Sequence, residues 1–179
     1  MPILVLLISV IVHAEEQPTD FRQARWGMSR EQVKEVEKKA EFVDEDEELL
    51  LYKGALAGFD VSIVYVFVSG QLVRGAYFTD RTHSNKNDYI SDYQRLKALL
   101  AKKYGLPTSS HIWWRNDRYQ DSPQDWGFAT GIGDLQYNTI WVTKSTKIEL
   151  LLTGNNDEIQ NGIRYDNIGL ELLRQGSPG

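Results

Sequence analysis

Residues 60–79 read DVSIVYVFVSGQLVRGAYFT, and this stretch carries the clearest structural pattern in the chain. Its first part alternates with the period of a β-strand, which places Val61, Ile63, Tyr65 and Phe67 on one face. The dipeptide Ser69-Gly70 is typical of a two-residue hairpin turn. We therefore expect an antiparallel hairpin. Its returning strand would carry three apolar residues on one face: Leu72, Ala76 and Phe78.

The segment before this hairpin begins with a helix signature. Ser29 has the preference of an N-cap residue, and Gln32 three positions later completes a capping box. This pattern predicts a helix over residues 30–40. The acid-rich run EFVDEDEE at 41–48 is expected to be a solvated loop, and residues 49–53 are expected to form a short strand.

The second half of the chain opens on the strongest helical pattern, which follows a polar linker at 80–88. Apolar residues recur there mostly three or four positions apart: Tyr89, Tyr93, Leu96, Leu99, Leu100 and Tyr104. Gly105 and Pro107 then end the helix. Further strands are expected at 111–115, 135–143, 146–153 and 159–165, with an irregular glycine-containing stretch at 127–134 and a short helix or tail at 169–175.

Both halves thus place a helix before antiparallel strands. We expect an α+β fold made of two helix-plus-antiparallel-meander units, at 21–80 and 86–175. Together they would form one compact two-layer domain with helices on a sheet, preceded by a flexible lead at 15–20. The identity between the halves is too low to establish a duplication.

Composition excludes several classes of function. The chain has 179 residues, no cysteine, a formal net charge of −5 and a pI near 5.2. Without cysteine it forms no disulfide, holds no metal through thiolates and carries no lipid attached through cysteine. Its acidic balance argues against nucleic acid as a partner.

The N-terminal residues carry an export pattern. Residues 3–12 read ILVLLISVIV, a run too short to span a bilayer comfortably but typical of the apolar region of a signal peptide. Val12 and Ala14 suit a signal peptidase site, so we expect residues 1–14 to be cleaved. The alternatives are an uncleaved anchor and a buried N-terminal strand. The product is expected to be periplasmic or secreted, not a lipoprotein, and without a stable membrane span after cleavage.

One motif supports a family resemblance. Residues 24–29 read ARWGMS and lead through Gln32 and Val33 into the first helix, a WGxSxxxV entry. In this motif, and in the sequence KYGLP at 103–107, the chain resembles a group of small exported bacterial proteins, many of them uncharacterised. Its architecture is similar to the SmpA/OmlA outer-membrane assembly lipoproteins and to the β-lactamase inhibitor protein. The resemblance implies helices backed by an antiparallel sheet and offers no catalytic residue, and the missing cysteine departs from the lipoproteins.

The residue types that usually catalyse reactions or bind metals do not converge in this sequence. His83 and His111 lie in different halves without a metal-binding spacing, and no Gly-x-Ser-x-Gly elbow is present. The acidic run at 41–48 begins like a calcium loop but lacks the required glycine and final glutamate. The glycines at 131–133 do not open a helix with a following lysine, as a phosphate loop does. We therefore expect no metal, no cofactor and no catalytic residue.

A dense group of aromatic and basic side chains is the candidate interaction site. It comprises Trp113, Trp114, Arg115, Arg118, Tyr119 and Trp126. Adjacent strand residues point to opposite faces, so one of Trp113 and Trp114 should face the core and the other solvent. The outward indole could stack on a sugar or anchor a protein partner. The alternative is that it packs beneath the loop at 116–125.

These features favour an exported, non-enzymatic binding module of the bacterial cell envelope that recognises another envelope protein or a cell-wall polymer. One alternative is a glycan hydrolase using Asp117, Asp121 or Asp125, which requires paired carboxyl groups about 5 to 9.5 Å apart. Another is a small-ligand carrier, which requires an apolar pocket between helix and sheet. The sequence leaves the oligomeric state open.

Overall fold

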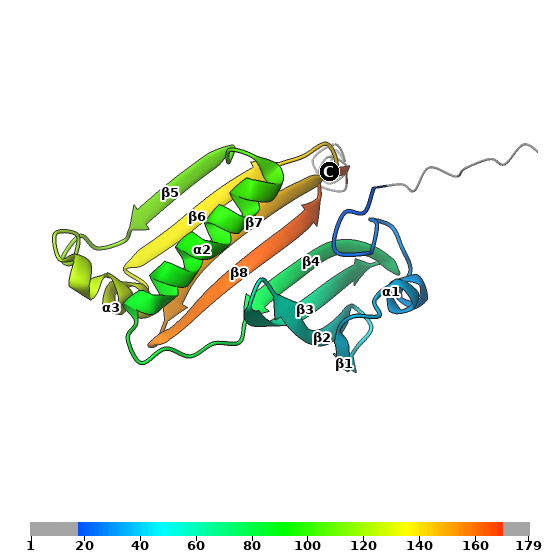
Figure 1. The fold of residues 1–179 in the computed structure, drawn as a ribbon, viewed down its shortest axis with the longest axis horizontal. Coiled ribbons are helices and arrows are strands. Elements are labelled where there is room, and N and C mark those ends of the chain that lie inside the picture. Colours follow the sequence, from blue (N-terminus) through cyan, green and yellow to red (C-terminus); the bar gives the residue numbers. More distant parts are fainter. Residues whose placement is uncertain (1–17, 170–179) are drawn as a thin grey trace, which may run out of the picture.

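The computed structural model describes residues 18–169, whose strands form one eight-stranded antiparallel sheet (Figure 1). The expected α+β class is confirmed. The predicted signal peptide and its cleavage site, the start of the flexible lead and nearly all of the predicted C-terminal helix or tail lie outside the described residues. Among the described helices, none combines the length and the apolar character needed to cross a membrane.

The sheet consists of two four-stranded meanders. Along the chain the elements are α1 (Arg30–Val36), β1 (Glu41–Glu45), β2 (Leu49–Leu56), β3 (Phe59–Val68), β4 (Gln71–Thr79), α2 (Asn87–Tyr104), β5 (Ser109–Trp114), a 3-10 turn η1 (Pro123–Asp125), α3 (Trp126–Gly131), β6 (Leu135–Val142), β7 (Thr146–Asn155) and β8 (Glu158–Asn167). Across the sheet the order is β1-β2-β3-β4-β8-β7-β6-β5. The meanders therefore meet at the pair β4–β8, and β1 and β5 are the outer edges.

The hairpin of residues 60–79 forms as predicted. Ser69 and Gly70 both have positive φ angles, 51° and 74°, which is the conformation of a two-residue turn that matches the twist of antiparallel strands. The prediction that Leu72 shares a face with Ala76 and Phe78 is wrong. The register shifts between Val66 and Phe67, so Leu72 pairs with Phe67 on the buried face, while Ala76 and Phe78 lie on the opposite face.

Two boundaries in the first half also differ from expectation. The expected helix over 30–40 is shorter in the structure, because α1 ends at Val36 and Glu37 no longer has helical geometry. Outside the helix, the Glu37 carboxylate accepts hydrogen bonds from Arg22 and Tyr65. Residues Glu41–Glu45 form β1 where a loop was expected. All five residues are exposed, so the acids are as well solvated in a paired edge strand as they would be in a loop.

The stretch 127–134, expected to be irregular, contains α3. Its glycines serve close packing: a Cβ on Gly127 would lie 2.3 Å from the backbone carbon of Lys86. Likewise, a Cβ on Gly154 of β7 would lie 2.1 Å from the carbonyl oxygen of Thr130. Helix α3 can therefore sit directly against the start of α2 and against β7, which the glycine pattern alone did not reveal.

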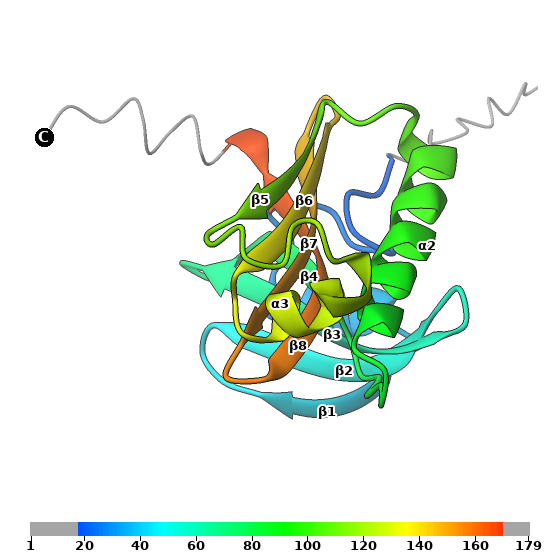
Figure 2. The same cartoon turned by 90° about the vertical axis from the view of Figure 1, so that its left-hand side faces the viewer.

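The core lies on one side of the sheet, which we call the covered face. Figure 2 shows α2 standing along this side, while the opposite side carries no helix in the described part of the chain. Tyr93, Leu96 and Leu100 of α2 are buried together with Trp141 and Leu150 of the sheet. We call the opposite side the open face.

Phe21, just before α1, covers the place where the meanders meet. Its ring lies 5.0 to 5.2 Å from the ring centroids of Tyr65, Tyr77 and Tyr165, which come from β3, β4 and β8. The ring rests on Gly75, where a Cβ would come within 2.1 Å of it. Phe21 therefore seals the junction between the two halves of the sheet.

Beside this ring, the buried carboxylate of Glu37 holds the N-terminal segment to the sheet. Arg22 donates to both of its oxygens, at 2.5 and 3.1 Å, and the Tyr65 hydroxyl donates at 2.5 Å. Burial alone would raise the pKa of Glu37, but these hydrogen bonds and the Arg22 charge outweigh it, so the pKa lies below its ordinary value. Burial and the bond to Glu37 raise the pKa of Tyr65.

Replacing Phe21 tests how much its packing over the β4–β8 junction stabilises the fold. Phe21→Ala should lower the free energy of unfolding by about 3–5 kcal/mol, because it removes a fully buried ring and leaves a cavity over Gly75. Phe42→Ala, at a half-exposed position on β1, should cost less than about 1 kcal/mol. Urea unfolding of both variants measures the difference, and equal losses would contradict the assigned role of Phe21.

The Glu37 contacts predict a specific acid sensitivity. A depressed pKa in the folded state stabilises the fold above the unfolded glutamate pKa of about 4.3, and this stabilisation is lost as the pH falls through the lower folded value. Glu37→Gln should therefore be less stable at neutral pH and lose less stability on acidification. The exposed Glu35→Gln on the same helix should follow the wild type in urea unfolding at each pH.

Candidate binding site

Strand β5 places the two neighbouring tryptophans on opposite faces. Trp113 is 77% exposed and shares the open face with its cross-strand partner Gln136. Trp114 points to the covered face, where its ring meets that of Trp126 at 6.0 Å in an edge-to-face contact. Trp113 is thus the outward indole that the sequence could not specify.

A cleft of about 310 Å3 opens beside Trp113 on the open face. It is lined by Trp113, Arg115, Gly133, Asp134 and Gln136. Arg115 follows β5 and Asp134 precedes β6, and the Arg115 amide donates to the Asp134 carbonyl at 2.7 Å. The β5–β6 ladder therefore brings these polar groups to the same end of the sheet as the indole.

The polar groups of the cleft are held in place by contacts of their own. Nη2 of Arg115 donates to the carboxylate of Asp134 and to the carbonyl of Ile132, both at 3.1 Å. Nη1 of Arg115 and Oδ2 of Asp134 make no hydrogen bond to the described residues. The cleft can thus offer a charged donor and a charged acceptor in fixed positions next to an apolar surface.

The remaining predicted site residues do not line this cleft. Trp126 donates through Nε1 to the carbonyls of Tyr119 and Gln120, so the 116–125 loop packs over Trp126 rather than over Trp113. Tyr119 is partly buried against Phe128, with 5.5 Å between ring centroids. Arg118 is exposed in the loop. The aromatic cluster therefore divides into one outward residue and a packed group.

The acids proposed for glycan hydrolysis lie apart from the cleft. Asp117 and Asp121 are exposed in the loop, and Asp125 ends the 3-10 turn η1. Among the described residues that line the cleft, Asp134 is the one with a carboxylate, and this carboxylate is already paired with Arg115. The described cleft thus lacks the two facing carboxyl groups of a glycosidase.

Sequence reasoning missed Gly133, Asp134 and Gln136 as partners of Trp113. They precede or begin β6, and only the register of β5 against β6 brings them next to the indole. Gly133 adopts a φ of +79°, which lets the chain turn from α3 into β6. In the sequence, the only sign of a special feature near these residues was the pair of glycines at 131 and 133, and these did not indicate which strands would pair.

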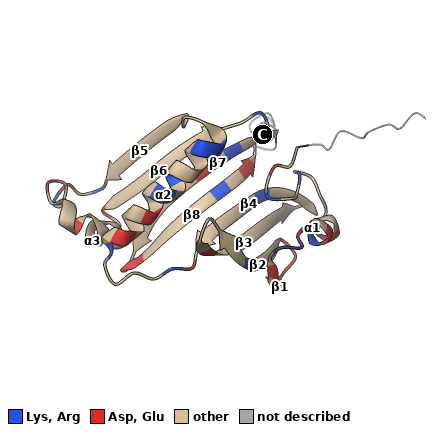
Figure 3. Cartoon of the chain, in the orientation of Figure 1, with Lys and Arg blue, Asp and Glu red and all other residues tan. Residues whose placement is uncertain are grey.

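The centre of the open face carries a row of paired charges. Arg74 bonds Asp166, Arg164 bonds both Asp166 and Glu149, and Asn138 donates to Glu149. This row crosses β4, β8, β7 and β6, and Figure 3 shows a basic and an acidic position close together on β8. The two arginines and the two carboxylates of this row neutralise one another, and the cleft is a separate feature at the β5 end of the face.

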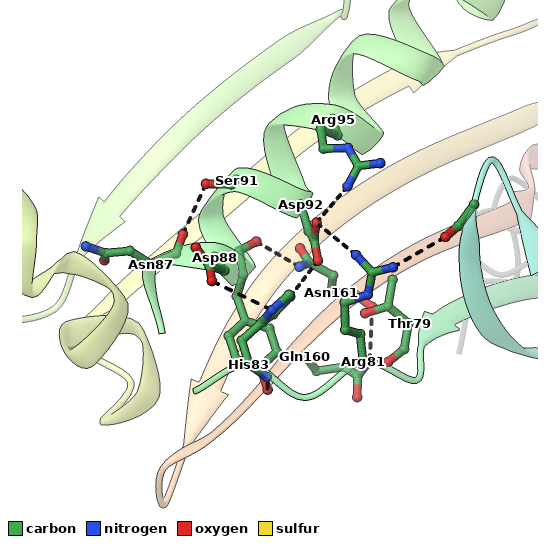
Figure 4. A network of polar contacts seen from close by, with 12 residues as sticks. Thr79, Arg81, His83, Asn87, Asp88, Ser91, Asp92, Arg95, Gln160 and Asn161 are labelled. Atoms are coloured by element: carbon green, nitrogen blue, oxygen red, sulfur yellow. Dashed lines mark hydrogen bonds and ion pairs between the residues drawn. The ribbon is translucent and has the colours of Figure 1, made fainter. Parts of the chain in front are cut away.

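A second polar cluster lies where the 80–86 linker meets α2 (Figure 4). Asp92 of α2 is buried, with His83 Nε2 at 2.7 Å, Arg95 Nη1 at 3.3 Å and Arg81 Nη1 at 3.8 Å. Both arginines also lie over the ring of Phe59. The cluster fastens the linker and β3 to α2, and among residues 18–169 no group of three or more His, Asp or Glu side chains could hold a metal.

Comparisons of the chain with protein-family models, with curated proteins and with solved structures gave no match.

The Asp92 cluster makes a stability prediction. Asp92→Ala should lower the free energy of unfolding by about 2–3 kcal/mol, because it leaves His83 and two arginines without their shared buried acceptor. Asp88→Ala, an exposed carboxylate 4.0 Å from the same imidazole, should cost less than about 1 kcal/mol. If urea unfolding shows no difference between the variants, the cluster does not fasten the linker.

Proposed function

We propose that the chain is an exported, non-enzymatic binding module of the bacterial cell envelope, and that its ligand is a cell-wall glycan held in the cleft beside Trp113. The observation that carries this proposal is the juxtaposition of an exposed indole with the fixed Arg115–Asp134 pair and the Gln136 amide. A sugar ring has an apolar face of C–H groups and a rim of hydroxyls. The cleft supplies a matching flat apolar surface and polar groups at its border.

The two alternative functions find less support in this arrangement. A hydrolase needs two carboxyl groups that face each other. Among the described residues that line the cleft, Asp134 alone carries a carboxyl group. A small-ligand carrier needs space between α2 and the sheet, where Tyr93, Leu96 and Leu100 instead pack into the core. Binding by surface recognition requires neither.

A protein partner is a second candidate ligand because the open face also exposes large apolar side chains. Val68, Phe78 and Val142 are each between 40% and 53% exposed there. They lie apart from the cleft, so a protein partner and a glycan would depend on different residues.

Export and the two-unit architecture are parts of the same proposal. The apolar N-terminal run supports delivery to the periplasm or outside the cell, by the signal-peptide pattern. Each four-stranded meander follows a helix in the chain, which supports two helix-plus-meander units. The relationship to the small exported proteins rests on the WGxSxxxV entry in the sequence. The helix of the first unit, α1, has seven residues and is much shorter than the 18-residue α2 of the second unit.

Sedimentation with insoluble peptidoglycan tests the glycan proposal. The wild-type protein should pellet with the polymer, and Trp113→Ala should weaken binding about tenfold or more, which corresponds to about 1.4 kcal/mol. The variant should keep the wild-type urea midpoint, because its side chain is mostly exposed.

Phe78→Ala is the matched control, since it truncates an exposed aromatic on the same face away from the cleft. It should bind the polymer as the wild type does. Absence of binding by the wild type, or equal binding by Trp113→Ala, would overturn the glycan proposal. Loss of binding in Phe78→Ala alone would instead indicate recognition by the apolar part of the open face.

A further inference from the structure

The two edge strands of the sheet, β1 and β5, differ in how well they are protected against pairing with a further strand. Edge strand β1 reads EFVDE, its pairing with β2 is interrupted by a register shift, and Glu45 is paired with Lys34 at 2.5 Å. Edge strand β5 reads SSHIWW and pairs with β6 without interruption. Figure 3 shows no basic or acidic position along it. Charges and bulges are the usual means by which proteins prevent edge strands from pairing, and β5 has neither.

No described strand pairs with the outer side of β5, so its backbone can add a strand there. In an antiparallel ladder, the residues that bond to one neighbour alternate with those that point the other way. The Arg115 amide bonds to the Asp134 carbonyl of the β6 side, which sets the phase of this alternation. The N–H and C=O groups of Ser110, Ile112 and Trp114 therefore point away from β6, toward the free edge.

The side chains of β5 add apolar surface at the same edge. Ile112 is 54% exposed on the covered-face side, beyond the reach of the core, and Trp113 is exposed on the open face. A further strand beside β5 would cover Ile112 and lie alongside Trp113. It would thus bury backbone groups and apolar area together.

We infer that the strand which adds to β5 is β5 of a second copy of the chain, antiparallel and centred on Ile112. This register places Ile112 opposite the partner's Ile112, Trp113 opposite the partner's His111, and Ser110 opposite the partner's Trp114. No charged side chain lies within the strand, and Arg115 falls opposite the partner's Ser109, so no like charges meet.

The same construction on the other edge would be unfavourable. An antiparallel pairing of two β1 strands centred on Val43 places Glu41 opposite the partner's Glu45. β5 is therefore the edge that suits a twofold interface, in which the same surface of both copies is used. The sheet would become continuous across the two copies, and the partner's His111 would border the indole of the glycan cleft.

The pairing should be weak, because six residues from each copy form a small interface. We expect a reversible monomer–dimer equilibrium in sedimentation velocity over about a hundred-fold range of micromolar concentrations. Ile112→Lys places two like charges at the twofold axis and should weaken the dimer at least about tenfold. Val142→Lys, an exposed β6 residue on the open face, should dimerise as the wild type does.

Cysteine cross-linking tests the register, since the chain contains no other thiol. Residues in a hydrogen-bonded antiparallel pair have Cα atoms about 5.5 Å apart, within the range of a disulfide. Ile112→Cys should therefore give a covalent dimer on mild oxidation that reducing agent reverses. Phe42→Cys on β1 should stay monomeric.

A wild-type protein that remains monomeric at every concentration would overturn the inference, as would a dimer that survives in Ile112→Lys. Equal cross-linking of Ile112→Cys and Phe42→Cys would also contradict it. The inference does not depend on glycan binding: the dimer is measured without polymer, and the glycan proposal is measured with Trp113→Ala and Phe78→Ala.

Discussion

The two meanders meet at one pair of strands, β4 and β8, and the burial of this pair beneath Phe21 is the contact on which the rest of the structure depends. The ring touches tyrosines from three strands and can do so because Gly75 has no side chain. The residues after Phe21 extend the same attachment. Gly27 donates its amide to the Leu72 carbonyl, and Trp26 donates through Nε1 to Thr146. The WG motif therefore has a structural role, because it ties the N-terminal segment to both meanders.

The described N-terminal segment and the helices lie on one side of the sheet, and no described element covers the other side. In a sheet with one solvated face, each strand usually alternates buried apolar residues with outward polar ones. Here the outward residues at the centre of the sheet are paired charges. Glu149 and Asp166 are buried, yet each is neutralised by arginine. Because these four charges are paired with one another, the row that they form has little capacity left to recognise a ligand by charge. This leaves the β5 end as the place where fixed polar groups and apolar surface coincide.

Local patterns in the sequence predicted those elements whose signals are local. The hairpin turn at Ser69-Gly70 and the long helix α2 follow from turn chemistry and from helical spacing. β1 was missed because acids in a solvated strand look like acids in a loop, and α3 because glycine can indicate close packing as well as irregular structure. Trp113 was named as a candidate, but Asp134 and Gln136 were not, since only strand register brings them beside it. Register between distant strands is a tertiary property that no short window of sequence carries.

The position of Trp113 is difficult to explain by folding alone. A side chain that is 77% exposed contributes little to the free energy of unfolding, and a large apolar residue on an unprotected edge strand favours unwanted association. The neighbouring Arg115–Asp134 pair is also mostly solvated on the arginine side, so it contributes little to stability by itself. Its two anchoring contacts nevertheless fix the guanidinium, which reduces the entropy lost when a ligand binds. An exposed indole and a preorganised ion pair that do little for folding therefore support the proposal that this cleft contacts a ligand outside the chain.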